Sequence, residues 1–245
     1  MLNNNRSNST AEIDVLVLCG GAGSRLHPLI SNIPKGMALI RGRPFLDILV
    51  DDLVKQGFRR IIFCVGHLKE QIIDRFKLRN DANFQFSEEH VLLGTGGAVQ
   101  NALSMVNSDP ILILNGDSVC PINFGELLQF HFANASSATF VLTDPKERID
   151  GGIVFIDGCD KVQSFLEKTS SKPPFDGYIN AGIYVLELES LAFSDLKPPF
   201  SLEYDIFPTL TKGNSCYGFV VESKLVDIGT PERYLKANND GITKS

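Results

Sequence analysis

A glycine-rich stretch directly after an apolar run is the feature that most constrains what this chain can fold into. Residues 13–18 are mostly apolar and predict a buried strand. The glycines that follow it are Gly20, Gly21 and Gly23. Because they lack a Cβ, they let backbone N–H groups approach an anion, and Arg25 and Lys35 add two positive charges nearby. The stretch predicts a site for several adjacent negative charges, such as those of a nucleoside triphosphate.

Two standard nucleotide-binding motifs do not fit this stretch. The P-loop pattern G-x-x-x-x-G-K-[ST] has no match in the sequence. The dinucleotide pattern G-x-G-x-x-G fits residues 21–25 but then meets Leu26 where its third glycine belongs. The next apolar strand, residues 60–66, also lacks the terminal Asp or Glu that would hold a ribose.

Residues 20–29 read G-G-A-G-S-R-L-H-P-L, and residues 34–37 read P-K-G-M. Together they resemble the signature of the sugar-nucleotide pyrophosphorylases, G-G-x-G-[ST]-R-L-x-P-L followed by P-K-P-M. Further blocks of the family follow in order at 39–46, 94–97, 114–117, 165–168, 179–184 and 226–231. Within the family the chain most resembles the short guanylyltransferases that act on D-glycero-α-D-manno-heptose 1-phosphate. Gly36 replaces the second proline, and we expect this change to loosen the loop that carries Lys35.

The composition fits one globular domain. With 245 residues, 43% of them hydrophobic and 21% charged, the chain is long enough for one substantial α/β domain. A net charge of −6 argues against a general affinity for nucleic acid or for an anionic membrane. Neither a secretory signal nor an apolar run of membrane-spanning length is visible. Five scattered cysteines without a C-x-x-C pair favour a reducing, cytoplasmic compartment, without zinc or a disulfide framework.

Strand and helix patterns alternate in the first half of the chain, with helices expected at 44–57, 69–76 and 97–106 and strands at 13–18, 61–65, 84–87 and 110–114. Such alternation predicts βαβ units in a doubly wound, mixed and mostly parallel α/β sheet. Strand patterns dominate later, at 139–143, 152–157, 162–167, 179–186 and 216–221.

The resemblance implies a Rossmann-like, glycosyltransferase-A-like nucleotidyltransferase fold over a single domain, residues 1–245. Its nucleotide-binding half is expected at 13–136 and its sugar-phosphate-binding half at 137–237. We expect no C-terminal left-handed β-helix, although one is frequent in the family.

The reaction that the resemblance implies is attack by a sugar 1-phosphate oxygen on the α-phosphorus of a nucleoside triphosphate. Since the nucleophile is already an anion, charge neutralisation and in-line placement matter more than a strong base. Asp117 follows the apolar strand 110–114, at the edge where α/β sheets place ligands, and Asp227 follows an apolar pair much later. By resemblance these two carboxylates share a Mg²⁺ ion, with phosphates and water completing its shell. Taken alone, either residue fits a turn or a helix cap equally well.

Three cations are expected to act on phosphate groups. Arg25 and Lys35 are assigned to the triphosphate, and by resemblance Lys168 binds the sugar phosphate. The alternative for each is a solvated surface charge, which is the usual state of Lys and Arg.

The sugar itself is expected to contact four residues that the resemblance assigns. Glu167 and Asn180 match positions that hydrogen-bond sugar hydroxyls. Gly152 and Gly182 would let the backbone lie close to the sugar, although Gly152 fits a simple turn as well.

Glu89 bears on the choice of base, because it lies close to where many family members place a Gln that faces the base. A carboxylate accepts hydrogen bonds, and guanine offers two adjacent donors at N1 and its 2-amino group, whereas uracil and thymine offer one N–H. This position favours GTP, the alternative being an exposed acidic pair with Glu88. The residues expected to bind the nucleotide are Leu18, Gly20, Gly21, Gly23, Ser24, Glu89, Gly94 and Thr95.

The expected activity is Mg²⁺-dependent nucleotidyl transfer from GTP to D-glycero-α-D-manno-heptose 1-phosphate, for surface polysaccharide biosynthesis. Mannose 1-phosphate as acceptor, and UTP, dTTP or CTP as donor, stay open. A non-catalytic subunit that senses nucleotide sugars also stays open, because function resides in the site and not in the fold. No nucleic-acid or membrane partner is expected, and a homo-oligomer is left open.

Overall fold

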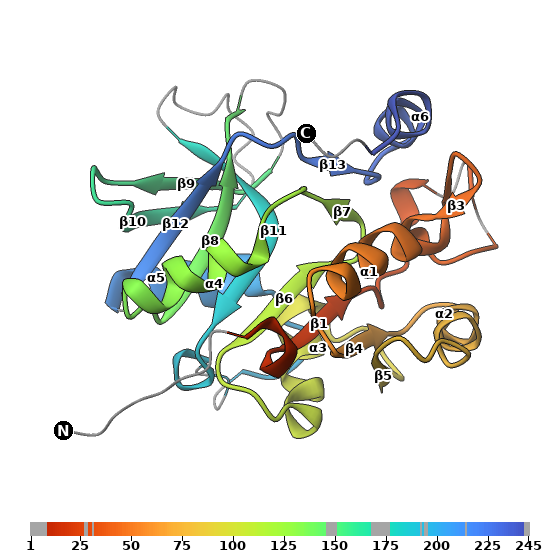
Figure 1. Cartoon of the computed structure of the whole chain (residues 1–245), viewed down its shortest axis with the longest axis horizontal. Helices are drawn as coiled ribbons and strands as arrows, with labels where there is room; N and C mark the ends of the chain where they lie inside the picture. The colour runs from red at the N-terminus through yellow and green to blue at the C-terminus, as the bar shows by residue number, and fades with distance from the viewer. Residues whose placement is uncertain are drawn as a thin grey trace.

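The computed structural model describes residues 9–26, 29–30, 32–145, 151–167, 177–191, 193, 196–213 and 215–242. Its centre is a nine-stranded sheet, shown in Figure 1. Four neighbouring parallel strands form one side of it, in the order β5–β4–β1–β6. They are β1 (Asp14–Leu18), β4 (Arg60–Val65), β5 (Asn83–Glu88) and β6 (Ile111–Asn115).

Three helices connect these parallel strands: α1 (Phe45–Lys55), α2 (Lys69–Phe76) and α3 (Gly94–Ala102), the last continued by a 3-10 turn at Leu103–Met105. The first connections lead from β1 to β4 and on to β5, whereas β6 returns to the other side of β1. This reversal of strand order is where open α/β sheets bind ligands, beyond the carboxyl ends of the strands. The loops after β1 and β6 therefore lie at the expected ligand crevice.

Antiparallel pairing extends the sheet beyond β6. The long strand β11 (Tyr178–Leu186) pairs with β9 near its start and with β6 near its end, and its other edge pairs with β8. The remaining strands are β8 (Ala138–Thr143), β9 (Ile153–Ile156), β10 (Val162–Leu166) and β12 (Cys216–Val221). Two short ladders stand apart, β2 (Leu39–Ile40) with β3 (Arg43–Pro44) and β7 (Ser118–Val119) with β13 (Val226–Asp227).

Helices cover both faces of the sheet, and the strand residues alternate between two apolar cores. Val15 and Val17 of β1 face the core that contains α1 and α4 (Phe124–Ala133), which lie over the same face in Figure 1. Leu16 faces the second core, with α3 and α5 (Phe207–Gly213). A one-turn π-helix at Leu202–Ile206 leads into α5, and α6 (Pro231–Asp240) follows β13. This three-layer arrangement confirms the doubly wound mixed sheet expected from the sequence.

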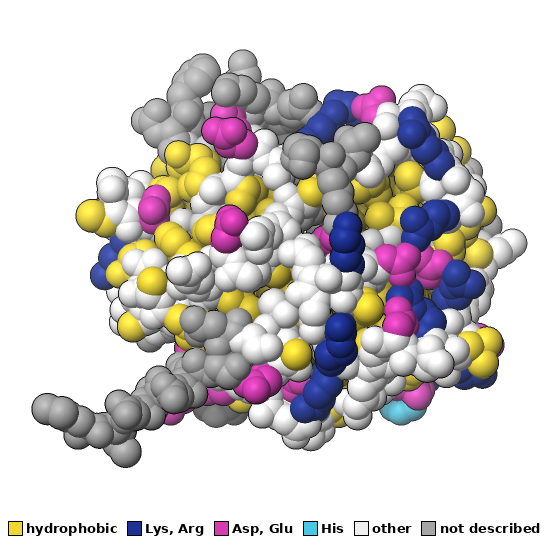
Figure 2. Space-filling model, in the orientation of Figure 1, with side chains coloured by type: hydrophobic (Ala, Val, Ile, Leu, Met, Phe, Trp, Pro, Cys, Tyr) yellow, Lys and Arg dark blue, Asp and Glu magenta, His cyan; other side chains and the backbone are white. Residues whose placement is uncertain are grey.

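Charged side chains of both signs are interleaved on the face drawn in Figure 2, over α1 and α2. Arg43 and Arg79 both pair with Asp51, and Arg75 pairs with Asp47. The exposed Arg43–Asp51 pair contributes little stability, whereas Asp47 is a buried carboxylate that Arg75 neutralises. This face is a mixed-charge surface rather than a field of one sign. Within the described part of the chain, no helix has the length and apolar content needed to cross a membrane.

The predicted elements agree with the structure in position, with shifts of a residue or two at most ends. The exception is the helix expected at 97–106, because α3 begins at Gly94 and its regular part ends at Ala102. Three helical segments were not predicted: α4, the π-helix with α5, and α6. Phe207 of α5 packs against Tyr184 of β11 with ring centroids 4.8 Å apart, so this unpredicted segment is fixed on the central sheet.

Candidate active site

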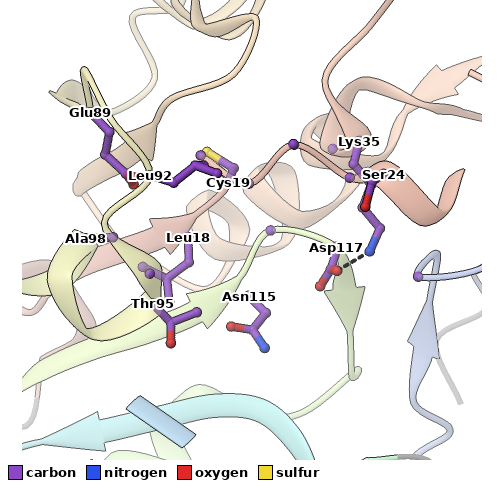
Figure 3. Close-up of a pocket in the computed structure, with 18 of the residues that line it drawn as sticks. Leu18, Cys19, Ser24, Lys35, Glu89, Leu92, Thr95, Ala98, Asn115 and Asp117 are labelled. Carbon is purple, nitrogen blue, oxygen red and sulfur yellow. Dashed lines mark hydrogen bonds and ion pairs between the residues drawn. The ribbon is translucent and has the colours of Figure 1, made fainter. Parts of the chain in front are cut away.

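A cavity of about 610 Å³ opens at the carboxyl ends of β1 and β6. Among the residues that line it are these expected from the sequence: Leu18, Gly20, Gly21, Gly23, Ser24, Arg25, Lys35, Glu89, Gly94, Thr95 and Asp117. Figure 3 places Glu89, Leu92 and Cys19 on one side and Lys35, Ser24 and Asp117 on the other. The cavity therefore has a partly apolar end with one carboxylate and a charged end beside the glycine loop.

Lys35 and Asp117 form an ion pair at the charged end, drawn as a dashed line in Figure 3. The Lys35 ammonium donates a hydrogen bond to Oδ2 of Asp117, and the lysine side chain is only 14% exposed. Lys35 begins a 3-10 turn that ends at Met37, and Asp117 follows β6. A nearly buried lysine with an acidic partner is not the solvated surface charge that was the alternative for this residue.

Asp227 lies beside Asp117 because β7 and β13 pair. Ser118 is opposite Asp227 in that ladder, and the Ile228 N–H donates to the Asp117 carbonyl oxygen at 3.0 Å. The Asp227 carboxylate accepts hydrogen bonds through Oδ1 from Arg233 Nη1 at 3.0 Å and from the Gly229 N–H at 2.8 Å. The structure therefore brings the two predicted metal carboxylates together, Asp117 paired with Lys35 and Asp227 paired with Arg233.

The donor set suits a Mg²⁺ ion. Magnesium usually takes one or two carboxylates and fills its other positions with water and substrate phosphates. Asp117 and Asp227 supply such a pair, and the described residues contain no cluster of three or more His, Cys, Asp or Glu side chains able to hold a metal. A metal held jointly with phosphates fits these residues better than a metal enclosed by protein ligands alone.

A second, smaller cavity of about 150 Å³ shares Arg25, Asn115, Asp117 and Gly229 with the first. All four residues expected at the sugar border it: Gly152, Glu167, Asn180 and Gly182. Lys168, the third expected cation, lies outside the residues that the structure describes.

Asn180 and Gly182 have structural roles in β11 besides their place at this cavity. The Asn180 side chain donates to the Tyr184 hydroxyl at 2.7 Å and accepts from the Gly182 N–H at 3.0 Å. Gly182 has φ +75°, and a Cβ there would lie 2.6 Å from the side-chain nitrogen of Asn115. The missing Cβ therefore makes room for Asn115, in addition to any room that it leaves for a ligand.

Glu89 lies at the apolar end of the larger cavity, just after β5. Its Oε2 accepts a hydrogen bond from the Leu93 N–H at 3.1 Å. Burial raises the pKa of Glu89 above its ordinary value, and the Leu93 hydrogen bond opposes part of that rise. Its neighbour Glu88 points elsewhere and pairs with Lys69 at 2.7 Å, so the two carboxylates do not form one exposed acidic pair.

Four polar residues at the cavities were not singled out from the sequence: Asn115, Ser118, Glu203 and Arg233. Asn115 borders both cavities and stands in the family block at 114–117, so its motif was a usable signal. Glu203 and Arg233 border the smaller cavity from the π-helix and from α6. Neither lies in a pattern typical of a binding site, and only the folded chain brings them here.

Comparisons with known proteins identify the family of the chain. The family model described as nucleotidyl transferase matches residues 14–244, and the chain belongs to that family. The chain is 31% identical to a D-glycero-alpha-D-manno-heptose 1-phosphate guanylyltransferase of Aneurinibacillus thermoaerophilus, over 93% of this chain and 98% of that protein. It is 33% identical to a mannose-1-phosphate guanylyltransferase of Mycobacterium tuberculosis, over 95% of this chain but only 65% of the relative. The chain thus spans slightly less than two thirds of that longer protein.

Solved structures give the same fold. HddC from Yersinia pseudotuberculosis superposes with a TM-score of 0.80 at 31% identity, covering 93% of this chain and 99% of that one. A second HddC structure, complexed with GMP-PN, has a TM-score of 0.78. A putative glucose-1-phosphate thymidylyltransferase from Bacillus anthracis reaches 0.83 at 19% identity and supports the fold alone.

Proposed function

We propose that this chain transfers a guanylyl group from GTP to a sugar 1-phosphate and releases pyrophosphate, with D-glycero-α-D-manno-heptose 1-phosphate as the favoured acceptor. The observation that carries the proposal is the convergence of Lys35, Asp117, Asp227 and Arg233 where the two cavities meet. A Cβ on Gly229, which borders both cavities, would lie 2.8 Å from Asp227 Oδ1 and 3.5 Å from Lys35 Nζ. Two polyanions can meet at such a point only where cations offset their repulsion.

The larger cavity suits the nucleotide. The triphosphate would follow the glycine loop toward Lys35, and the base would lie toward Glu89, at the opposite end in Figure 3. A carboxylate there can accept from the two adjacent donors of guanine. Arg25 borders both cavities and would contact phosphate groups of both substrates.

Asp117 and Asp227 would hold Mg²⁺, which when bound supplies positive charge to the phosphates and orients them. Lys35 pairs with Asp117, and Arg233 pairs with Asp227. Lys35 lines the larger cavity and would donate hydrogen bonds to the phosphates there. The sugar would occupy the smaller cavity beside Glu167 and Asn180.

Mannose 1-phosphate is the second candidate acceptor, supported by the 33% identity to the Mycobacterium tuberculosis enzyme. The heptose phosphate is favoured because the Aneurinibacillus relative is matched over 98% of its length, against 65% for the mannose-1-phosphate enzyme. A place for this reaction in the cytoplasm, ahead of surface polysaccharide assembly, belongs to the same proposal. It is supported by the thiol state of the cysteines, all five of which are free.

The test is pyrophosphate release from each of four nucleoside triphosphates, mixed with Mg²⁺ and a panel of sugar 1-phosphates, with product masses determined. The expected result is a GDP-heptose of the right mass at the highest kcat/KM. GDP-mannose as the dominant product would select the second acceptor. Binding of a nucleotide sugar without any pyrophosphate release would show that the protein is a non-catalytic sensing subunit and not an enzyme.

A further inference from the structure

Glu203 presents a carboxylate to the smaller cavity, although nothing in the sequence marks it as a ligand-binding residue. It lines that cavity together with Glu167 and Asn180, the two side chains expected at the sugar. It lies in the second position of the π-helix Leu202–Ile206, a rare helix type that is frequent at functional sites. Besides the two aspartates expected at the metal, the cavity therefore has two glutamates, Glu167 and Glu203, where the resemblance to known proteins assigned one.

Two hydroxyl groups hold Glu203 in place. Thr95 Oγ1 donates to Glu203 Oε2 at 2.6 Å, and Ser201 Oγ donates to the same oxygen at 2.7 Å. Each hydroxyl has a single proton, so both protons are used on this carboxylate. Oε1 receives no hydrogen bond from the residues that the structure describes, which leaves it available to a ligand.

The sequence predicts Thr95 as a nucleotide-binding residue, yet its hydroxyl makes its hydrogen bonds to the segment that carries Glu203. Besides donating to Glu203, Thr95 Oγ1 accepts a hydrogen bond from the Leu202 N–H at 2.9 Å. The hydroxyl therefore has no proton left to donate to a nucleotide. Thr95 still lines the larger cavity, as Figure 3 shows.

The start of α3 is shaped to receive the segment that carries Glu203. Gly96 N–H and Gly97 N–H both donate to the Phe200 carbonyl oxygen, at 3.0 and 3.3 Å. A Cβ on Gly94 would lie 2.3 Å from that oxygen, and one on Gly96 would lie 2.5 Å from the Phe200 ring. The glycines of this block thus admit the Phe200 segment, so that Thr95 meets Glu203.

We propose that Glu203 accepts a hydrogen bond from a hydroxyl of the acceptor sugar, and that Thr95 acts as its positioning residue rather than as a nucleotide ligand. The inference rests on the proposed function and names a second sugar-recognising carboxylate for it. Carboxylates suit this task because sugar hydroxyls donate readily to charged acceptors, which form the stronger hydrogen bonds. Glu203 and Glu167 then contact the sugar from two different elements, the π-helix and the end of β10.

The first test separates the two substrates of the reaction with single substitutions at Thr95. Thr95→Val removes the hydroxyl at nearly constant volume and should raise KM for the sugar 1-phosphate about 3- to 10-fold. KM for GTP should stay within about twofold, and Thr95→Ser, which keeps the hydroxyl, should behave like the wild type. Thr209→Val, at an exposed position on α5, is the matched control for the change of residue type.

The second test identifies the ligand of Glu203. Glu203→Gln should raise KM for the sugar 1-phosphate about 10- to 100-fold. The wild type should then be assayed with sugar 1-phosphates that each lack one hydroxyl. For one of these substrates KM should rise by the same factor, because the hydroxyl that Glu203 binds is missing. With Glu203→Gln, removing that hydroxyl should raise KM no further. Stabilisation of the unreacted protein by GTP alone, measured as a shift in Tm, should be equal in the wild type and in both variants.

The outcomes are distinct. If Thr95→Val raises KM for GTP, or reduces the GTP-induced shift in Tm, Thr95 is a nucleotide ligand and the inference is wrong. If every deoxygenated substrate loses the same factor with Glu203→Gln as with the wild type, Glu203 is only structural. If the wild type transfers nothing to any sugar 1-phosphate, the proposed function is wrong. The GTP-induced shift in Tm of Thr95→Val then still shows whether Thr95 is a nucleotide ligand.

Discussion

The Lys35 ammonium donates a hydrogen bond to the Asp117 carboxylate, and this contact joins the loop region after β1 to the loop after β6. It places a fixed positive charge where the phosphates of two substrates would meet. Lys35→Met should lower kcat/KM about 10²- to 10³-fold, the usual effect of losing one donor to a developing charge. Pyrophosphate release measures it. Lys55→Met, at an exposed position at the end of α1, should change little, and an equal loss in both variants would contradict the role of Lys35.

Asp227 should determine how much metal the reaction needs. Asp227→Asn should raise the Mg²⁺ concentration for half-maximal rate by more than about tenfold, since even residues behind a metal ligand contribute about 10- to 100-fold to affinity. A titration of rate against free Mg²⁺ measures this, and excess chelator should abolish transfer in the wild type. Asp240→Asn, at the exposed end of α6, is the control. An unchanged requirement in Asp227→Asn would remove this residue from the metal site.

Glu89 should select the base. Glu89→Gln should reduce the preference for GTP over UTP in kcat/KM by about 10- to 100-fold, because the amide presents only one acceptor to the two donors of guanine. Glu88→Gln is the matched control, since the neighbouring carboxylate pairs with Lys69 outside the cavity. The hypothesis does not survive if both variants keep the wild-type preference.

The same residue should make GTP binding depend on pH. Burial raises the pKa of Glu89, and only the ionised carboxylate accepts from both guanine donors. KM for GTP should therefore rise as the pH falls through that raised pKa, at a higher pH than for an ordinary glutamate, and should be lowest above it. Profiles of wild type and Glu89→Gln separate this effect from the titration of the phosphates. The difference in KM for GTP between the wild type and Glu89→Gln should vanish at acidic pH. A difference that stays constant with pH would show that Glu89 is not the group that titrates.

Gly36 should be required by its packing. A Cβ at this position would lie 2.7 Å from Leu46 Cγ and 3.1 Å from the Gly116 carbonyl oxygen. Gly36→Ala should therefore lower the free energy of unfolding by about 1 to 3 kcal/mol, as overpacked cores do. Urea denaturation measures it. Gly36→Ala should lower the free energy of unfolding by less when Leu46→Ala is already present, because the clash with Leu46 is then removed. If the effects of the two substitutions on this free energy simply add, Leu46 is not the obstacle.

Most of the sheet could be predicted from the sequence because its strands are buried on both faces. Runs such as Ile111–Leu114 are continuously apolar, and the helices between the strands carry one apolar face each. The later helices were harder to predict. Only two residues of the five-residue π-helix that leads into α5 are buried, and its position depends on contacts with α3 that no local pattern reports.

Part of the candidate site could likewise be predicted from the sequence, and part could not. Lys35, Asp117 and Asp227 stand in sequence blocks, and the fold brings them together. Glu203 and Arg233 reach the cavities only through the packing of the π-helix and α6, so spacing along the chain carried no signal for them. Thr95 was placed at the nucleotide by its block, whereas its hydroxyl contacts Glu203, a partner 108 residues away in sequence.

The short ladder between β7 and β13 joins two segments that are far apart in the sequence. The two residue pairs of this ladder and the Ile228–Asp117 hydrogen bond hold Asp227 beside Asp117, and β13 is synthesised more than 100 residues after β7. The four parallel strands and the glycine-rich stretch are therefore synthesised before the second carboxylate of the pair. A chain that ended just ahead of β13 would contain all nine strands of the central sheet but only one of the two carboxylates proposed to hold Mg²⁺.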